Sequence, residues 1–385
     1  MYSIKKVRSF LFLFSVFILG CIDPATPEYD LISDLLYIEG FASTEAGNSY
    51  AVISQSIIFS SGTGSDVFID DANVSFVNTA TNEQVILNFE DDYYVPPDDF
   101  AVSVGETWVL EVNLSNGKRY VSSPEIVLEP VPIKGIEANY NPELVFNELM
   151  NSYVPGHVIS VSFDDPQNTP NYYYWNFRSF EKITTCMKCE GGIFRNGICE
   201  SYGYQPNVKS YYEYLCETEC WQIRRAENIK IYSDELSDGL SVDNAHAADI
   251  LLYTKQNILV EMQQISLSVS AYNYYKIIRD IVQNNSSFNA PPPAALIGNI
   301  YNPDDSEEYV LGRFTAAASV KESIFIERGN IPDESIEGSQ PIQLEGCEVC
   351  VMDGVACGTS ECPIFTVPCE ERRDRTGIMP PGWIE

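Results

Sequence analysis

Ten cysteines form two groups of five in this chain of 385 residues. The first group is Cys186, Cys189, Cys199, Cys216 and Cys220, and the second is Cys347, Cys350, Cys357, Cys362 and Cys369. Each group opens with a C-x-x-C pair, a spacing that lets two thiolates chelate one zinc ion. The same cysteines could instead pair as disulfides, which persist only in oxidising compartments. The choice between the two depends on where the chain is delivered.

The N-terminus predicts export. Three basic residues precede an apolar run from Phe10 to Leu19, which is the layout of a secretory signal. A run of ten residues rises only about 15 Å in a helix, about half of what a stable membrane span needs. The junction Leu19-Gly20-Cys21 resembles the lipobox of lipoprotein precursors, because Cys21 offers a thiol for a lipid and Gly20 is small. We therefore expect residues 1–20 to be a signal peptide and Cys21 to carry a covalent lipid that anchors the protein to a membrane.

Export favours disulfides over zinc, because zinc ribbons belong to reducing compartments. Five is an odd number, so complete pairing within the chain requires at least one bridge between the two groups of cysteines. We expect the cysteine-rich C-terminal segment 331–385 to pack on a loop-rich, cysteine-rich insert at 184–222. Redox catalysis by a C-x-x-C pair is disfavoured, since the βαβ pattern of thioredoxin-like proteins is absent.

The charge balance excludes some partners. The chain has 55 Asp and Glu against 23 Lys and Arg, a formal charge of −32. Nucleic acids and anionic lipid surfaces are poor partners for such a chain. Acidic clusters at 90–92, 98–99 and 304–305 are expected to be solvated surface. Calcium is the metal they could bind, but none of them has the spacing of an EF-hand loop.

Residues suited to catalysis are scarce. His157 and His246 are the only histidines, and neither belongs to a G-x-S-x-G, H-E-x-x-H or Walker motif. A pair of carboxylates could serve a glycosidase, but any acidic β-protein contains such pairs. We expect no enzymatic activity, no metal and no cofactor other than the lipid.

Short strands dominate the first half of the chain. Residues 21–34 hold two prolines and four acids and predict an extended tether. Runs of β-branched and aromatic residues, separated by turn signals, then predict an antiparallel β-sandwich of immunoglobulin-like type over 35–130. Val74, Phe76 and the alternating stretch 109–114 are its expected core positions. The predicted strands cover 35–42, 49–59, 67–78, 84–89, 106–114 and 119–128.

A second β-rich α+β domain is expected over 133–330, with strands at 158–163, 172–180, 309–316 and 323–327. It contains one prominent helix within 266–285, capped by Ser268 or Ser270 and packed through Ala271, Tyr275, Ile278 and Val282. An aromatic run lies much earlier in this domain, in the strand at 172–180. Its residues Tyr172, Tyr174 and Trp175 could stack on a sugar ring, although packing between sheets is the favoured alternative.

Several short motifs carry a family resemblance. They are Ala271-Tyr272, Gly298-Asn299-Ile300-Tyr301-Asn302, Leu311-Gly312-Arg313-Phe314 and Pro380-Pro381-Gly382-Trp383. In this order they resemble the Bacteroidetes lipoprotein family labelled domain of unknown function 4249. Members of that family are similar in being lipoproteins often encoded beside TonB-dependent outer-membrane receptors, and the family offers no catalytic residues.

The resemblance implies an outer-membrane lipoprotein, on the cell-surface face rather than the periplasmic face, that assists a TonB-dependent receptor in nutrient capture or receptor assembly. The acidic tether fits a surface-export signal loosely and a plain linker equally well. The alternative function is a structural or adhesive surface protein that contacts other envelope proteins. The ligand is not specified by the sequence.

Overall fold

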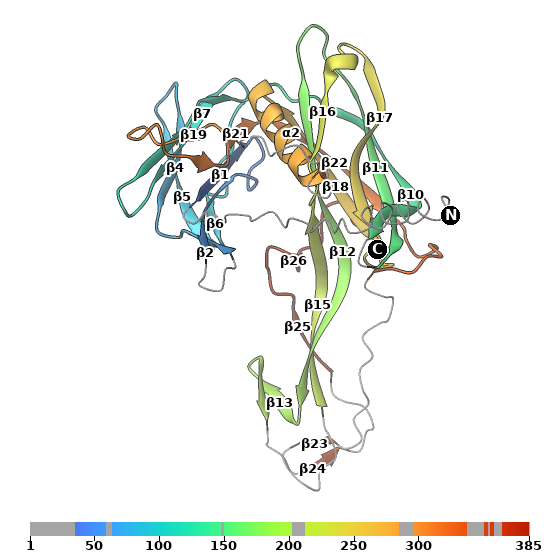
Figure 1. Ribbon diagram of the computed structural model, residues 1–385. Helices are drawn as coiled ribbons and strands as arrows, with labels where there is room; N and C mark the ends of the chain where they lie inside the picture. Colours follow the sequence, from blue (N-terminus) through green and yellow to red (C-terminus); the bar gives the residue numbers. More distant parts are fainter. Residues whose placement is uncertain are drawn as a thin grey trace, which may run out of the picture.

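The computed structural model describes residues 35–58, 64–147, 150–201, 212–284, 296, 298–336, 350–352, 355–357 and 364–384. The predicted signal peptide, Cys21, the tether, Cys347 and Cys362 lie outside these residues. The described chain is mainly β, with a β-sandwich and a second β-rich domain that carries one α-helix, as the sequence predicts (Figure 1). No helix in these ranges is both long enough and apolar enough to cross a membrane.

Twelve connected strands build the sandwich. Most neighbouring strands are antiparallel. Strand β5 connects the two layers, because it pairs with β4 in one and with β6 in the other. The strands are β1 (Leu36–Ser43), β2 (Tyr50–Ile58), β3 (Gly64–Phe68), β4 (Asn73–Asn78), β5 (Gln84–Glu90), β6 (Tyr93–Val95), β7 (Thr107–Asn113), β8 (Arg119–Ser122), β9 (Glu125–Ile126), β19 (Ile300–Tyr301), β20 (Val310–Leu311) and β21 (Phe314–Ala317).

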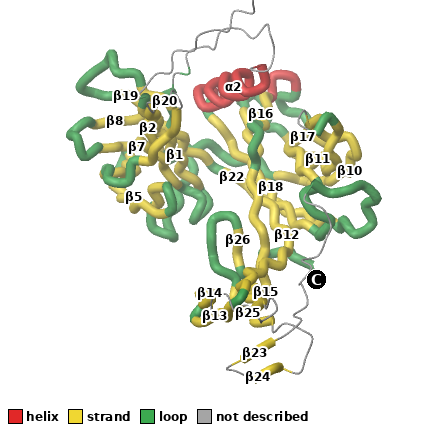
Figure 2. Tube along the Cα trace, turned by 60° about the horizontal axis from the view of Figure 1, so that its bottom comes forward, coloured by secondary structure: helices red, strands yellow, loops and turns green. Residues whose placement is uncertain are grey.

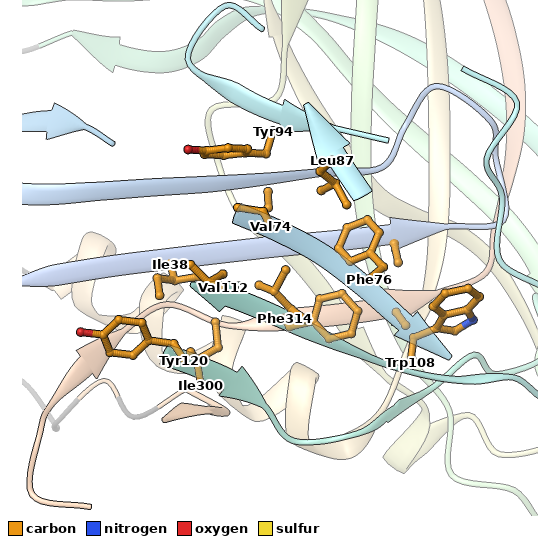
Figure 3. Close-up of a cluster of buried hydrophobic side chains, with 14 of the residues drawn as sticks. Ile38, Val74, Phe76, Leu87, Tyr94, Trp108, Val112, Tyr120, Ile300 and Phe314 are labelled. Atoms are coloured by element: carbon orange, nitrogen blue, oxygen red, sulfur yellow. The ribbon is translucent and has the colours of Figure 1, made fainter. Parts of the chain in front are cut away.

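The core of the sandwich follows from alternation along its strands. Val74 and Phe76 are fully buried, as expected. In β7 the inward residues are Trp108, Leu110 and Val112, so Val109 and Glu111 face outward. Figure 3 shows this core between the two layers, with the Phe76 ring 5.5 Å from the ring of Phe314.

Phe314 lies far outside the predicted sandwich, and this corrects the predicted domain boundary. Strands β20 and β21 run parallel to β1, and β19 pairs with β8. Residues 300–317 therefore complete the sandwich instead of belonging wholly to a second domain over 133–330. Parallel pairing between segments so distant in sequence leaves no local pattern, which explains why the sequence did not reveal it.

The second domain packs two sheets face to face. One has three strands, β10 (Ile133–Asn147), β11 (Ser152–Asp164) and β17 (Ser241–Leu251). The other has seven: β12 (Tyr172–Glu190), β15 (Tyr212–Arg225), β16 (Lys230–Ser233), β18 (Ile258–Leu267), β22 (Ser319–Ile326), β25 (Ile364–Pro368) and β26 (Arg375–Thr376). Buried residues such as Ile159, Val161, Trp175 and Val260 fill the space between the sheets. The short 3-10 helix η1 (Asp234–Leu236) joins β16 to β17.

Helix α2 (Val269–Asn284) covers the other face of the larger sheet (Figure 2). The backbone N–H of Ala271 donates to Ser268 Oγ at 3.1 Å, so Ser268 is the cap. Ala271 and Tyr274 are buried, whereas Val282 is 63% exposed. The expected helical face is therefore correct for its first turns and wrong for Val282.

The insert at 184–222 is not loop-rich. Its ends continue β12 and β15 as a long antiparallel ribbon that extends away from the rest of the protein (Figure 1). The hairpin of β13 (Gly192–Arg195) and β14 (Ile198–Ser201) lies at its far end, and β23 (Cys350–Met352) pairs with β24 (Val355–Cys357) nearby. The ribbon is a continuous β-ladder with one register shift, between Ile183 and Thr185, so it is a structured arm.

Candidate functional site

A buried ion pair within the sandwich is hydrogen-bonded to the second domain. Arg313, between β20 and β21, donates from Nη2 to the Glu125 carboxylate in β9, and both side chains are at most 6% exposed. The second Arg313 amino group donates to Ser270 Oγ at 3.0 Å, and Ser268 Oγ donates to Glu125 at 3.0 Å. Asn299 Nδ2 also donates to Glu125 at 3.3 Å. These hydrogen bonds connect the start of α2 to the sandwich, and the residues that make them are called the joint below.

Burial raises the pKa of Glu125, while Arg313 and the hydrogen bonds from Ser268 and Asn299 lower it. The carboxylate is therefore stabilised as an anion only by the partners that form the joint. A buried pair of this kind is costly to break, because the remaining charge stays desolvated.

Two glycines bring the backbone segments of the joint together. Gly312 has φ +100°, and a Cβ there would lie 1.9 Å from the carbonyl oxygen of Ile38. A Cβ on Gly298 would lie 1.6 Å from the carbonyl oxygen of Gly312. Only glycine permits these close approaches. The segments around residues 298 and 312 are therefore fixed against β1.

A cleft of about 740 Å³ opens between the two domains. Strands β1, β2 and β6 form one wall, and β12, β18 and α2 form the other. Residues 371–373 of the C-terminal segment complete it, and β26 lies between the sandwich and β12 in Figures 1 and 2. The side chains that carry its chemistry are Glu39, Tyr50, Tyr93, Tyr174, Tyr275, Arg178, Arg225, Glu261 and Arg373.

Tyrosines surround one carboxylate in this cleft. Glu39 accepts hydrogen bonds from Tyr37 and from Tyr50, the latter at 2.9 Å. Across the cleft, the rings of Tyr174 and Tyr275 stack at 5.1 Å. Burial, followed by the charge of Glu39, raises the pKa of Tyr50 and Tyr275 and brings that of Tyr174 to about 12. These phenols therefore stay protonated at neutral pH and present rings and hydroxyl groups, a surface suited to binding polar ring compounds.

Arginines also line the cleft. Arg178 binds Glu261 with two hydrogen bonds, at 2.7 and 3.2 Å. Arg225 Nη1 donates to the backbone oxygen of Arg373 at 2.7 Å, and the Arg373 guanidinium carbon lies 3.9 Å from the centre of the Tyr93 ring. The predicted site residues do not include these arginines. The cleft thus combines hydrogen-bonding aromatic rings with cationic groups.

A disulfide fixes the C-terminal part of the cleft. Cys220–Cys369 links the two cysteine groups across 149 residues, as their odd numbers require. Cys186–Cys216 and Cys189–Cys199 lie within the first group. In the described part of the second group, Cys350 and Cys357 are opposite each other in β23 and β24. Strands β25 and β26 both pair with β15, so the C-terminal segment packs on the insert as expected.

Residues 22–323 match the family described as Domain of unknown function (DUF4249). The chain belongs to this family. No curated protein and no solved structure is significantly similar to it. The residues that build the joint, Asn299, Gly298, Gly312 and Arg313, come from the motifs that resemble the DUF4249 family. Two of those motifs therefore supply residues to the contact between the domains.

The predicted stacking aromatics have separate environments in this DUF4249 protein. Trp175 is 2% exposed and donates its indole N–H to Gln264 at 2.8 Å, so its ring packs between the sheets, the alternative that the sequence favoured. Tyr172 is covered by Tyr272, with ring centres 4.7 Å apart. Tyr174 is the one of the three that lines the cleft. Alternate residues of β12 face opposite sides of the sheet, so one aromatic run serves both the core and the cleft.

The acidic clusters predicted from the sequence are not the ones that come closest to forming a metal site. Asp165, Asp234 and Asp238 bring carboxylate oxygens within 4.8 Å of one another. Asp234 accepts the backbone N–H of Asn171 and Asp238 that of Asn168, both at 2.7 Å. These bonds explain the cluster as loop structure.

The two histidines occupy different places in the second domain. His157 is buried, and burial with the nearby charge of Arg328 lowers its pKa to about 4. His246 is exposed and lies 2.7 Å from the Asp249 carboxylate, which also binds Lys230. Neither lines the cleft between the domains.

Proposed function

We propose that this protein is a lipid-anchored, non-enzymatic binding protein of the outer membrane, which captures a ligand in the cleft between its domains. In this proposal it acts as an accessory subunit of a TonB-dependent receptor and faces the cell surface. The observation that carries the proposal is the cleft itself, lined by tyrosines and arginines from two domains.

The construction of the cleft supports binding. Ligand sites commonly lie between domains and combine aromatic surfaces with a few polar groups. Here Tyr50 and Tyr93 come from the sandwich and Tyr174 from β12. The buried pair of Arg313 and Glu125 is hydrogen-bonded to Ser268 and Ser270 at the start of α2, which connects the two walls, so little conformational entropy is lost when a ligand binds.

The anchor and the partner rest on the sequence. A diacylglyceryl group on Cys21 and an acylated N-terminus would exceed the two chains that stable membrane anchoring requires. The receptor is proposed from what the DUF4249 resemblance implies. A tether of residues 21–34 would let the cleft lie above the membrane, close to a receptor.

Glycan and peptide arrays test capture. The full-length protein in mild detergent is applied as wild type and as Tyr174→Ala, with Tyr301→Ala as a control because Tyr301 is exposed on β19 outside the cleft. We expect a defined set of bound compounds that Tyr301→Ala retains and Tyr174→Ala loses. Identical binding by all three proteins would place the ligand elsewhere and contradict the proposal.

The ribbon of β12 and β15 favours a second function, a structural or adhesive surface protein. Met187 on β12 and Ile198 on the β13–β14 hairpin at its far end are 49% and 68% exposed, and two disulfides stiffen this arm. An arm of this kind could contact other envelope proteins. Recovery of such proteins with the wild type, but not with a Met187→Glu, Ile198→Glu variant, together with arrays that bind nothing, would favour this second function.

A further inference from the structure

We propose that the cleft binds an oxyanion, a carboxylate or phosphate group of its ligand, between the guanidinium groups of Arg225 and Arg373. This inference deepens the proposed capture function and rests on it for the ligand's biological role. The binding chemistry itself rests on the arrangement of the arginines.

Adjacent arginines are rare in this acidic chain. With 23 basic residues in 385, they occur only at 224–225 and 372–373. The fold brings the two pairs together, because the backbone N–H of Ile223 donates to Asp374 at 2.6 Å and Gln222 pairs with Arg375. Cys220–Cys369 fixes the same segments covalently. Two distant cationic pairs are thus placed together by several independent bonds.

In each pair of adjacent arginines, a carboxylate of the described residues neutralises the first arginine and not the second. Arg224 lies 3.8 Å from a Glu181 oxygen, and Arg372 binds Glu370 at 3.1 Å. Among the described residues, no carboxylate forms an ion pair with Arg225 or Arg373. Arg225 donates to the Arg373 backbone oxygen, and Arg373 rests on the Tyr93 ring and donates to its hydroxyl group. One guanidinium of each pair is therefore left for another anion.

In the protein without a ligand, the positive charges gathered around Arg225 repel one another. Partial desolvation in the cleft lowers the pKa of Arg225, and the like charges of Arg373 and Arg178 lower it further, against a smaller opposite effect of Tyr93 and Asp374. An oxyanion between the two guanidinium groups would remove this repulsion. Guanidinium forks also match carboxylate and phosphate oxygens in a bidentate manner.

Carboxylates that line the same cleft are mostly engaged elsewhere. Glu39 is bonded to two tyrosines, and Glu261 to Arg178. Glu371 accepts the backbone N–H of Gly377 at 2.6 Å. Glu90 and Asp91 are exposed at the rim. The oxyanion site therefore lies in the part of the cleft around Arg225 and Arg373. Tyr93 lies beside it, and the Tyr50 ring follows next to the Tyr93 ring.

Isothermal titration of the full-length protein in mild detergent, with citrate and separately with inorganic phosphate at constant ionic strength, tests the site. We expect saturable binding by the wild type of at least one probe. Arg225→Gln and Arg373→Gln should each weaken it about tenfold, the loss of one charged hydrogen-bonding group. Arg119→Gln is the matched control, because Arg119 is an exposed arginine paired with Glu111 on the sandwich, and it should leave binding unchanged.

The arms of the experiment separate its outcomes. Binding of citrate alone assigns a carboxylate ligand, and binding of phosphate alone a phosphorylated one. No saturable binding of either probe, or equal losses in Arg119→Gln, would overturn the inference. Circular dichroism of each variant verifies folding, and an intact fold with unchanged affinity in Arg225→Gln and Arg373→Gln would also overturn it.

Array binding of a neutral compound without binding of either probe would refute the oxyanion site but leave capture standing. Binding of the probes without any array ligand or receptor would refute the proposed function alone.

Discussion

Arg313 and Glu125 are 188 residues apart in sequence and form a buried ion pair where the sandwich meets helix α2. No oppositely charged residue lies within three positions of either partner in the sequence. Both partners belong to the sandwich, and their hydrogen bonds to Ser268 and Ser270 connect it to the second domain. The shape of the cleft therefore depends on these bonds.

Replacement of Arg313 by Met should destabilise the protein by about 3–5 kcal/mol, because the Glu125 carboxylate would stay buried without its cation. Urea unfolding of the full-length protein should also change from one transition to two, since the domains lose their joint. Arg119→Gln, which breaks an exposed pair, should cost at most about 1 kcal/mol. An effect of Arg313→Met no larger than that of Arg119→Gln would contradict the role of the joint.

Replacement of Gly312 by Ala tests the close approach of residues 312 and 38. Gly47 is the matched control: it also has positive φ, +77°, but a Cβ there would meet open space, with no contact inside 4 Å. Gly47→Ala should therefore show only the cost of the left-handed backbone, about 1 kcal/mol. Gly312→Ala should cost clearly more, because its Cβ meets the Ile38 carbonyl oxygen. Thermal unfolding measures both, and equal shifts in Tm would refute the packing argument.

Removal of the Cys220–Cys369 bridge by a double Ser substitution should lower stability by about 5 kcal/mol in the chain-entropy account. The Cys189–Cys199 bridge closes a far shorter loop, with a separation of 10, and its removal should cost about 3 kcal/mol. Urea denaturation without reductant compares the two double variants. A larger loss for the short loop would show that the long bridge does not constrain the unfolded chain.

His157 predicts a pH dependence of stability. Its pKa falls from 6.5 to about 4 in the folded protein, so the unfolded chain takes up a proton first as the pH drops. Stability should therefore decrease between pH 6.5 and 4, by at most about 3 kcal/mol from this group. His157→Gln should reduce the difference in unfolding free energy between pH 7 and pH 4.5. An unchanged difference would show that His157 titrates normally.

Local patterns predict local structure in this chain. The strand alternation identified Val74 and Phe76 as core, and the Ser268 cap and the apolar period located α2. The parity of the cysteines required a bridge such as Cys220–Cys369.

Long-range relationships were beyond those patterns. The parallel pairing of β21 with β1 and the meeting of Arg225 with Arg373 depend on tertiary packing, which leaves no period in the sequence. Trp175 shows the same limit, because an aromatic run does not state which face of a strand meets the core. Tyr174 in the aromatic run was the predicted residue that lines the cleft, and the rarity of adjacent arginines is a further sequence signal that could have pointed to it.

Co-purification tests the proposed function most directly. The full-length protein is recovered from outer membranes in mild detergent as wild type and as Cys21→Ser, and the proteins bound to each are identified by mass spectrometry. The wild type should be membrane-bound and should recover a TonB-dependent β-barrel receptor, whereas Cys21→Ser should be released and recover none. Recovery of no receptor with the wild type, or a Cys21→Ser protein that stays in the membrane, would contradict the proposal.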